Sequence, residues 1–189
     1  MKNLTAKKFI LNPHNPVGSW STNDSRYRFY AHKSLAELEL ICKKINKEWP
    51  TENGQSINMN AYPEMGELVL ERDRLSDSIR IFSAMAVEGY LNFYGVLRLG
   101  QNIYLENFER MPLVQKARSL ILVCDDLEIS KQHPLIQAAI KVSECRNSLV
   151  HPKAIEIPCS NSMAKDLELP VPQTARNAVK SMESFLWNF

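Results

Sequence analysis

The chain of 189 residues fits one domain, which is long enough to bury a core without disulfides or metal. With 44% hydrophobic and 23% charged residues, it has the composition of a globular protein, which excludes wholesale disorder. The formal net charge of +2 excludes a protein that coats nucleic acid by overall charge, so a nucleic-acid role would need a local basic patch.

Residues 1–24 lack helical periodicity, because Pro13, Pro16 and Gly18 interrupt them. We interpret this segment as an irregular N-terminal arm, with a short strand around residues 9–11. The remainder of the chain is expected to form a single helical domain.

A first helix is predicted to begin near Ser25, with Asp24 or Ser25 as its N-cap, and to end before Pro50. Its apolar residues recur three or four positions apart and form one stripe. The stripe consists of Tyr27, Ala31, Ser34, Leu38, Ile41, Ile45 and Trp49. The polar stretch 51–63 is predicted to be a loop.

A long helix is predicted over residues 64–99, and Gly100 is placed to cap its C-terminal end. One unbroken helix would be about 50 Å long, so two shorter helices broken near residues 76–78 are the alternative. The predicted buried face carries Leu68, Leu75, Ile79, Phe82, Ala86, Tyr90, Phe93 and Leu97.

Three further helices are predicted over residues 112–124, 134–151 and 172–187. Proline suits the first turn of the helix that begins at residue 112. Residues 152–171 contain several prolines and little periodicity, and are predicted to be a long loop.

Five helices without clear strand signals predict an all-α, up-and-down bundle of four to five helices over residues 25–189. The C-terminal residues Phe185, Leu186, Trp187 and Phe189 are expected to dock into the bundle or a subunit interface.

The four cysteines form no C-x-x-C and complete no zinc spacing with histidine, which predicts reduced thiols and no metal site. The N-terminus lacks the apolar core of a signal peptide, and no apolar run approaches the roughly 20 residues of a membrane span. The sequence therefore predicts a cytoplasmic protein with no membrane partner and no cofactor.

Arg146, Asn147 and His151 stand together at the predicted end of the fourth helix. The planar guanidinium of arginine matches two phosphate oxygens, and histidine can move a proton near neutral pH. Five residues turn a helix by about 500°, which leaves Arg146 and His151 roughly 140° apart. The length of arginine and a loosened last turn before Pro152 would still let both reach one phosphate. The structural alternative is that these basic residues bind free carbonyls at the helix end.

The segment Arg146-Asn147-Ser148-Leu149-Val150-His151 resembles the R-x4-6-H motif of the HEPN superfamily, whose members are bundles of four or five helices. In the long helix, Glu88-Gly89-Tyr90-Leu91-Asn92 is similar to the acidic-then-Asn pattern of several HEPN families. The resemblance covers residues 65–152.

This resemblance implies a homodimer whose two motifs meet in one cleft and cut RNA without metal, as in toxin–antitoxin, phage-defence and RNA-processing systems. Arg146 would stabilise the phosphate, His151 would transfer a proton, and Asn147 would support both. Glu88 and Asn92 would orient Arg146 across the cleft, or would only form a hydrogen-bonded pair with each other. Non-catalytic members bind nucleotide, RNA or a protein partner, and toxins of this kind are paired with an antitoxin protein.

Overall fold

The structure, a computed structural model, describes residues 23–48, 63–150 and 171–189. These residues are all helical apart from short connections, which confirms the predicted all-α class. The helices are α1 (Asp24–Glu48), α2 (Pro63–Leu99), α3 (Gln101–Asn107), α4 (Leu113–Asp125), α5 (Pro134–Val150) and α7 (Val171–Asn188). The predicted N-terminal arm 1–24 lies outside the described residues as far as residue 22, and Asp24 already belongs to α1. The predicted loops 51–63 and 152–171 also lie outside them, except for Pro63 and Val171, which begin α2 and α7. His151 lies outside the described residues as well.

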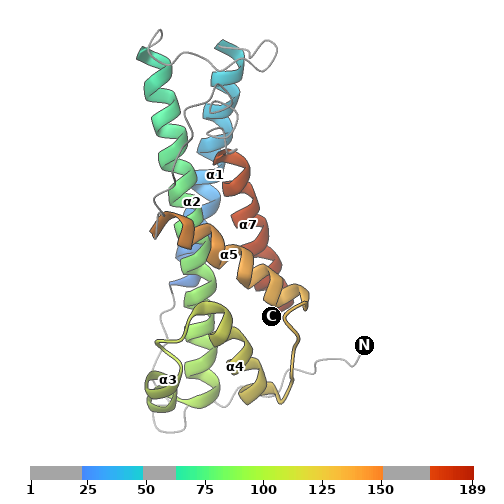
Figure 1. The fold of residues 1–189 in the computed structure, drawn as a ribbon. Helices are drawn as coiled ribbons and strands as arrows, with labels where there is room; N and C mark the ends of the chain where they lie inside the picture. The colour runs from blue at the N-terminus through green and yellow to red at the C-terminus, as the bar shows by residue number, and fades with distance from the viewer. Residues whose placement is uncertain (1–22, 49–62, 151–170) are drawn as a thin grey trace, which may run out of the picture.

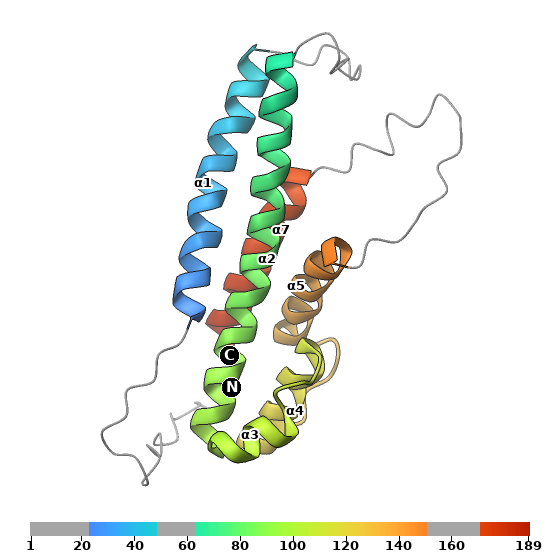
Figure 2. The same cartoon turned by 90° about the vertical axis from the view of Figure 1, so that its left-hand side faces the viewer.

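The long helix α2 is the centre of the bundle (Figures 1 and 2). Helix α1 runs antiparallel along it, and α5 and α7 pack against other sides of its middle. Helices α3 and α4 lie at the C-terminal end of α2. In the part of the chain that the structure describes, no helix combines the length and the hydropathy needed to cross a membrane.

Helix α1 packs the described part of the predicted apolar stripe against α2, and Trp49 of that stripe lies outside the described residues. Ala31, Leu38 and Ile45 are buried, and the rings of Tyr27 and Phe82 stack with centroids 6.2 Å apart. The helix begins one residue before the predicted start, because the Tyr27 N–H donates to the carbonyl of Asn23 at 2.9 Å. Burial of each large apolar side chain contributes roughly 1.5–3 kcal/mol, so this stripe holds the two helices together.

Helix α2 is one unbroken helix of 37 residues, which makes the alternative of two shorter helices wrong. The Ser76 hydroxyl, within the suspected break, donates to the carbonyl of Arg72 at 2.8 Å and leaves the helical bonding intact. Neighbours on several sides bury more of α2 than one stripe. The additional buried residues are Val69, Ser76, Ser83, Ala84, Val87, Leu91 and Gly95.

Gly100 ends α2 as predicted. Its φ of 85° is a conformation that favours glycine, and its N–H donates to the carbonyl of Val96 at 2.9 Å. The sequence reading missed α3, which begins at the next residue and has only seven residues. Its buried residue is Tyr104, too few for a periodic stripe to reveal it.

The C-terminal end of α7 docks only in part. Phe185 is buried, and the Phe189 ring lies edge-on to Tyr90 and Tyr94 of α2 at 5.2 and 4.7 Å. Trp187, in contrast, is 78% exposed. The predicted docking into the bundle is therefore confirmed for Phe185, Leu186 and Phe189, whereas Trp187 points away from the core.

Candidate functional site

Arg146 lies in the last turn and a half of α5, on the stripe that faces the bundle. Leu135, Ala139 and Val142 of this stripe are buried. Arg146 follows Val142 by four residues and Ala139 by seven, so it continues the same face beyond the core. Its side chain is half-buried, and it makes no hydrogen bond or ion pair within residues 23–48, 63–150 and 171–189.

This isolation distinguishes Arg146 from the other half-buried arginines of the described ranges. In each of the others, a guanidinium nitrogen lies 3.2 Å or less from a carboxylate oxygen. The pairs are Arg28 with Glu183, Arg72 with Asp73, Arg80 with Asp77, Arg98 with Asp125 and Arg176 with Glu39. Because a half-buried guanidinium is stabilised by an anion or acceptor, Arg146 is the arginine placed to bind an anion from outside the described chain.

Arg80 of α2, and not Arg146, binds the carbonyl near the end of α5. The Arg80 Nε donates to the carbonyl of Cys145 at 3.2 Å, and its Nη2 donates to the Ser148 hydroxyl at 2.5 Å. Ser148 in turn donates to the carbonyl of Cys145 at 3.0 Å. This arginine fixes the turn that carries Arg146. Sequence reasoning missed it, because 65 residues separate it from Cys145 and no local spacing connects them.

We expect Arg80→Ala to loosen the last turn of α5. Arg80 is only 12% exposed and its bonds reach α5, so its loss should lower the free energy of unfolding by about 1–3 kcal/mol. Amide hydrogen exchange of residues 146–150, followed by mass spectrometry, should be faster than in the wild type. Arg74→Ala is the control, because in the part of the chain that the structure describes Arg74 forms its ion pair with Glu71 of the same helix. Unchanged exchange in Arg80→Ala would contradict the assignment.

The other residues of the motif lie on different sides of α5 or beyond it. Asn147 is exposed, about 100° around the helix from Arg146, and its Nδ2 lies 3.4 Å from the Ser143 hydroxyl. His151 follows the last described residue of α5, so its position relative to Arg146 stays a prediction. Burial raises the pKa of the neighbouring Cys145 thiol, which makes Cys145 a poor nucleophile.

Glu88 and Asn92 lie apart from Arg146 within one chain. Eight and twelve residues separate them from Arg80, which is roughly 12–18 Å along the helix. The Asn92 Oδ1 accepts hydrogen bonds from Lys116 Nζ at 2.8 Å and from the Tyr104 hydroxyl at 2.5 Å. Glu88 Oε1 lies 3.6 Å from Lys116 Nζ. Both side chains contact Lys116 and form no hydrogen bond with each other, so they hold α4 against α2. Their role across a dimer cleft stays a prediction.

Lys116 is the buried charge that the sequence reading did not identify. Its side chain is buried in α4, and this burial lowers the pKa of its ammonium group below the ordinary value, although Glu88 opposes the shift. The unfolded chain therefore binds more protons than the folded chain in the window below pH 10.5. Stability attributable to Lys116 should rise as the pH rises through that window.

We expect Lys116→Met to be at least as stable as the wild type at pH 7, because methionine removes the cost of burying the ammonium group. In the variant, Asn92 still accepts a hydrogen bond from the Tyr104 hydroxyl, and burial raises the pKa of that hydroxyl to about 12. Glu88, which loses its partner, is 39% exposed and stays hydrated. Urea unfolding at pH 7 and pH 9.5 should show the advantage of the variant shrinking at the higher pH. A clear loss of stability at pH 7 would mean that the Lys116 bonds outweigh its desolvation.

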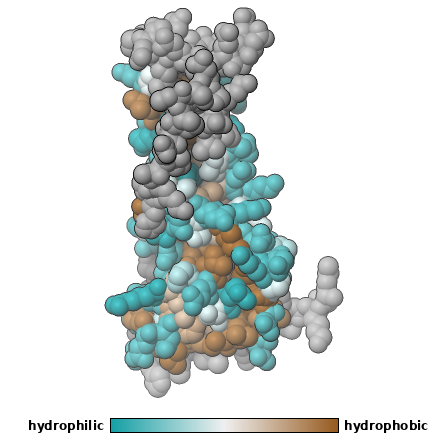
Figure 3. Space-filling model, viewed as in Figure 1, coloured by the Kyte–Doolittle hydropathy of each residue, from teal (hydrophilic) through white to brown (hydrophobic). Residues whose placement is uncertain are grey.

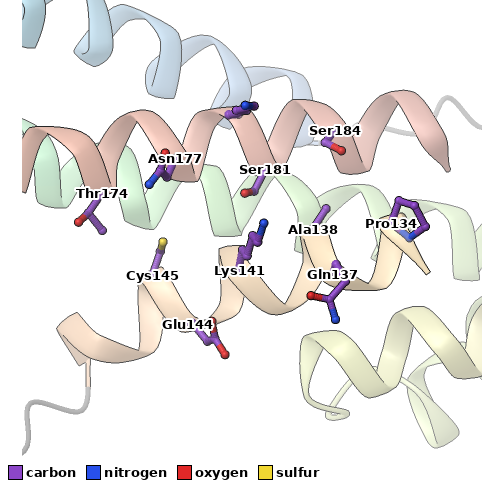
Figure 4. Close-up of a pocket in the computed structure, with 11 residues that line it drawn as sticks. Pro134, Gln137, Ala138, Lys141, Glu144, Cys145, Thr174, Asn177, Ser181 and Ser184 are labelled. Carbon is purple, nitrogen blue, oxygen red and sulfur yellow. The ribbon is translucent and has the colours of Figure 1, made fainter. Parts of the chain in front are cut away.

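A groove of about 560 Å³ lies between α5 and α7 (Figure 4). Lys141 on one wall and Lys180 on the other are exposed, and Glu144 is the acidic residue among the lining side chains. Cys145 lies at one end of the groove. Arg146, the next residue, is not among the lining residues, because successive side chains point about 100° apart around a helix. Two lysines among hydroxyl and amide groups suit a phosphate better than an apolar ligand.

The described residues contain no group of three or more His, Cys, Asp or Glu side chains placed to hold a metal ion. No protein-family model matches this chain, and neither the curated proteins nor the solved structures include a significant match to it.

Proposed function

We propose that this protein is a HEPN-like, metal-independent endoribonuclease that cuts RNA in a cleft between two copies of the chain. The observation that carries the proposal is Arg146, a half-buried arginine without a partner in the described chain, at the start of the R-x4-H segment. All the other half-buried arginines of these ranges are paired with a carboxylate, which leaves Arg146 with its charge uncompensated in the described chain.

The chemistry requires only groups that this segment offers. The 2′-OH of RNA attacks the adjacent phosphorus, the bond to the 5′-oxygen of the next nucleotide breaks, and a 2′,3′-cyclic phosphate forms. Arg146 stabilises the negative charge that develops on the phosphoryl oxygens. His151 transfers the proton that the 2′-OH loses or the leaving 5′-oxygen gains, and Asn147 orients the ribose or phosphate.

Two surface features support a contact between copies of the chain. On the face seen in Figure 3, hydrophobic side chains gather within a hydrophilic border in the middle of the molecule. Ile81, directly after Arg80, and Val150, at the end of α5, are both exposed apolar residues. A second copy on this face would bury them and bring two Arg146 side chains toward one strand.

The alternative is a non-catalytic dimerisation module of the same kind, which binds nucleotide, RNA or a protein partner. The placement of Glu88 and Asn92 favours it, because both are already engaged by Lys116 within one chain. For the nuclease, an antitoxin protein is the expected partner if it acts in a toxin–antitoxin or phage-defence system.

The test is incubation of the purified protein with structured and unstructured RNA in EDTA, followed by a denaturing gel and analysis of the new ends. We expect cleavage that magnesium does not enhance, with 2′,3′-cyclic phosphate and 5′-hydroxyl ends, and a dimer by sedimentation at micromolar concentration. If neither RNA were cut, the non-catalytic dimerisation module would be the remaining proposal. Cleavage by a monomer would overturn the shared cleft.

A further inference from the structure

We infer that a second surface of this protein, formed by the first turns of α1 and the end of α7, binds single-stranded nucleic acid. We call this surface the aromatic strip. It consists of Phe29, Tyr30 and Trp187, with the cations Arg26, Arg28 and Lys33 between them. The inference does not depend on the proposed cleavage, because the strip is built from residues outside the motif.

Three large aromatic side chains of the strip are in contact with solvent. Trp187 is 78% exposed, Phe29 61% and Tyr30 38%. The rings are nevertheless supported from behind. The Tyr30 ring lies 5.3 Å from that of Phe82, and the Phe29 and Tyr30 centroids are 6.0 Å apart. Rings that are exposed but held in place present flat faces on which unpaired bases stack.

Trp187 is joined to α1 by a shared carboxylate. Its Nε1 donates to Glu183 Oε2 at 3.1 Å, and the Arg28 guanidinium lies over its ring at 5.9 Å. Arg28 also donates to Glu183 at 2.7 and 2.5 Å, and His32 Nε2 lies 2.7 Å from the same carboxylate. One carboxylate thus faces both Arg28 and His32, and it fixes the indole beside them.

The charge of α1 suits a polyanion. From residue 25 to residue 36 the helix carries Arg26, Arg28, His32 and Lys33 and no acidic residue. Glu183 of α7 compensates the charge of Arg28, so Arg26 and Lys33 are the cations open to a phosphate. Lys33 is exposed and has no ion pair within the described ranges, and Arg26 lies 5.4 Å from the Tyr27 ring centroid. An apolar protein partner would not require these cations, whereas a phosphate backbone does.

Cations and rings alternate around the exposed face of α1. Lys33 lies one turn after Phe29, and Arg26 one turn before Tyr30, so each cation neighbours a ring on the helix surface. Along a bound strand, the cations would contact phosphates and the neighbouring rings would stack on bases. Because the bases of a duplex are already stacked and paired, the arrangement selects a single strand.

The probe is a fluorescently labelled 15-nucleotide oligothymidylate, which lacks the 2′-OH and cannot be cut by the proposed mechanism. Binding is measured by fluorescence anisotropy at several salt concentrations. We expect Phe29→Ala and Trp187→Ala each to weaken binding by about tenfold, since each removes a stacking face. Leu40→Ala is the matched control on the same helix, because Leu40 is 66% exposed and lies outside the strip. Its affinity should equal that of the wild type.

Lys33→Gln should reduce the salt dependence of binding, whereas Lys43→Gln, an exposed lysine farther along α1, should not. Absence of binding by the wild type, or equal affinities of the strip variants and Leu40→Ala, would overturn the inference. It would also be overturned if Phe29→Ala and Trp187→Ala only dissociated a dimer in sedimentation and left oligothymidylate binding unchanged. Oligothymidylate binding without RNA cleavage would leave this inference standing while the proposed nuclease failed.

Discussion

Arg146→Ala is expected to lower the rate of RNA cleavage by at least about 100-fold, the usual cost of removing one charge-stabilising donor. The free energy of unfolding should change by less than about 0.5 kcal/mol, because Arg146 is half-exposed and has no partner in the described chain to leave unsatisfied. His151→Ala should reduce cleavage by about 100- to 10,000-fold, as expected for loss of a general acid or base. Single-turnover cleavage in EDTA and urea unfolding measure the two effects separately.

Arg118→Ala is the matched control for Arg146→Ala, because Arg118 is exposed on α4 and has no ion pair within the described ranges. It should cut RNA like the wild type. Arg146→Lys keeps the charge but loses the planar fork, so we expect partial activity. If Arg146→Ala kept full activity and only lost stability, by about 1 kcal/mol, the arginine would be a structural residue. The nuclease proposal would then be wrong.

Most of the helices could be predicted from the sequence, because the signals are local. The apolar stripe predicts the extent of α1, and Gly100 predicts the end of α2. Both signals come from residues only a few positions apart in the sequence. Helix α3 could not be predicted, because its seven residues bury only Tyr104 and its existence depends on packing against α2. The extra burial of α2 is likewise a tertiary effect, since a pattern predicts one buried face and this helix has neighbours on several.

The candidate site also has features that the sequence shows and features that depend on the tertiary structure. The spacing of Arg146 and His151 is visible in the sequence, but the isolation of Arg146 is not, since it is defined by how the other arginines pair. Two of those pairs, Arg28 with Glu183 and Arg176 with Glu39, join residues 155 and 137 positions apart. The same limit applies to Glu88 and Asn92. Their spacing resembles a motif, yet the side chains bind a lysine on another helix.

Gly95→Ala should destabilise the protein although it improves the helix propensity of α2. A Cβ at position 95 would lie 2.4 and 2.6 Å from two carbons of the Tyr104 ring and 3.1 Å from a methyl carbon of Leu120. The ring cannot easily move, because it is buried, is stacked with Phe108 and is tied to Asn92 through its hydroxyl. Overpacking of this kind costs about 1–3 kcal/mol or more, which exceeds the gain of roughly 0.5–1 kcal/mol from replacing a helical glycine.

Gly66→Ala is the control for this prediction, because a Cβ at that position of α2 would meet nothing within 4 Å beyond the adjacent residues and the backbone of its own helix turn. It should gain stability by up to about 1 kcal/mol from helix propensity alone. A double-mutant cycle then identifies the cause of the loss at Gly95. If the Tyr104 ring is the obstacle, Gly95→Ala should cost much less in a Tyr104→Ala background than in the wild type. Equal costs in urea unfolding of the two backgrounds would mean that α3 does not pack against α2 through this glycine.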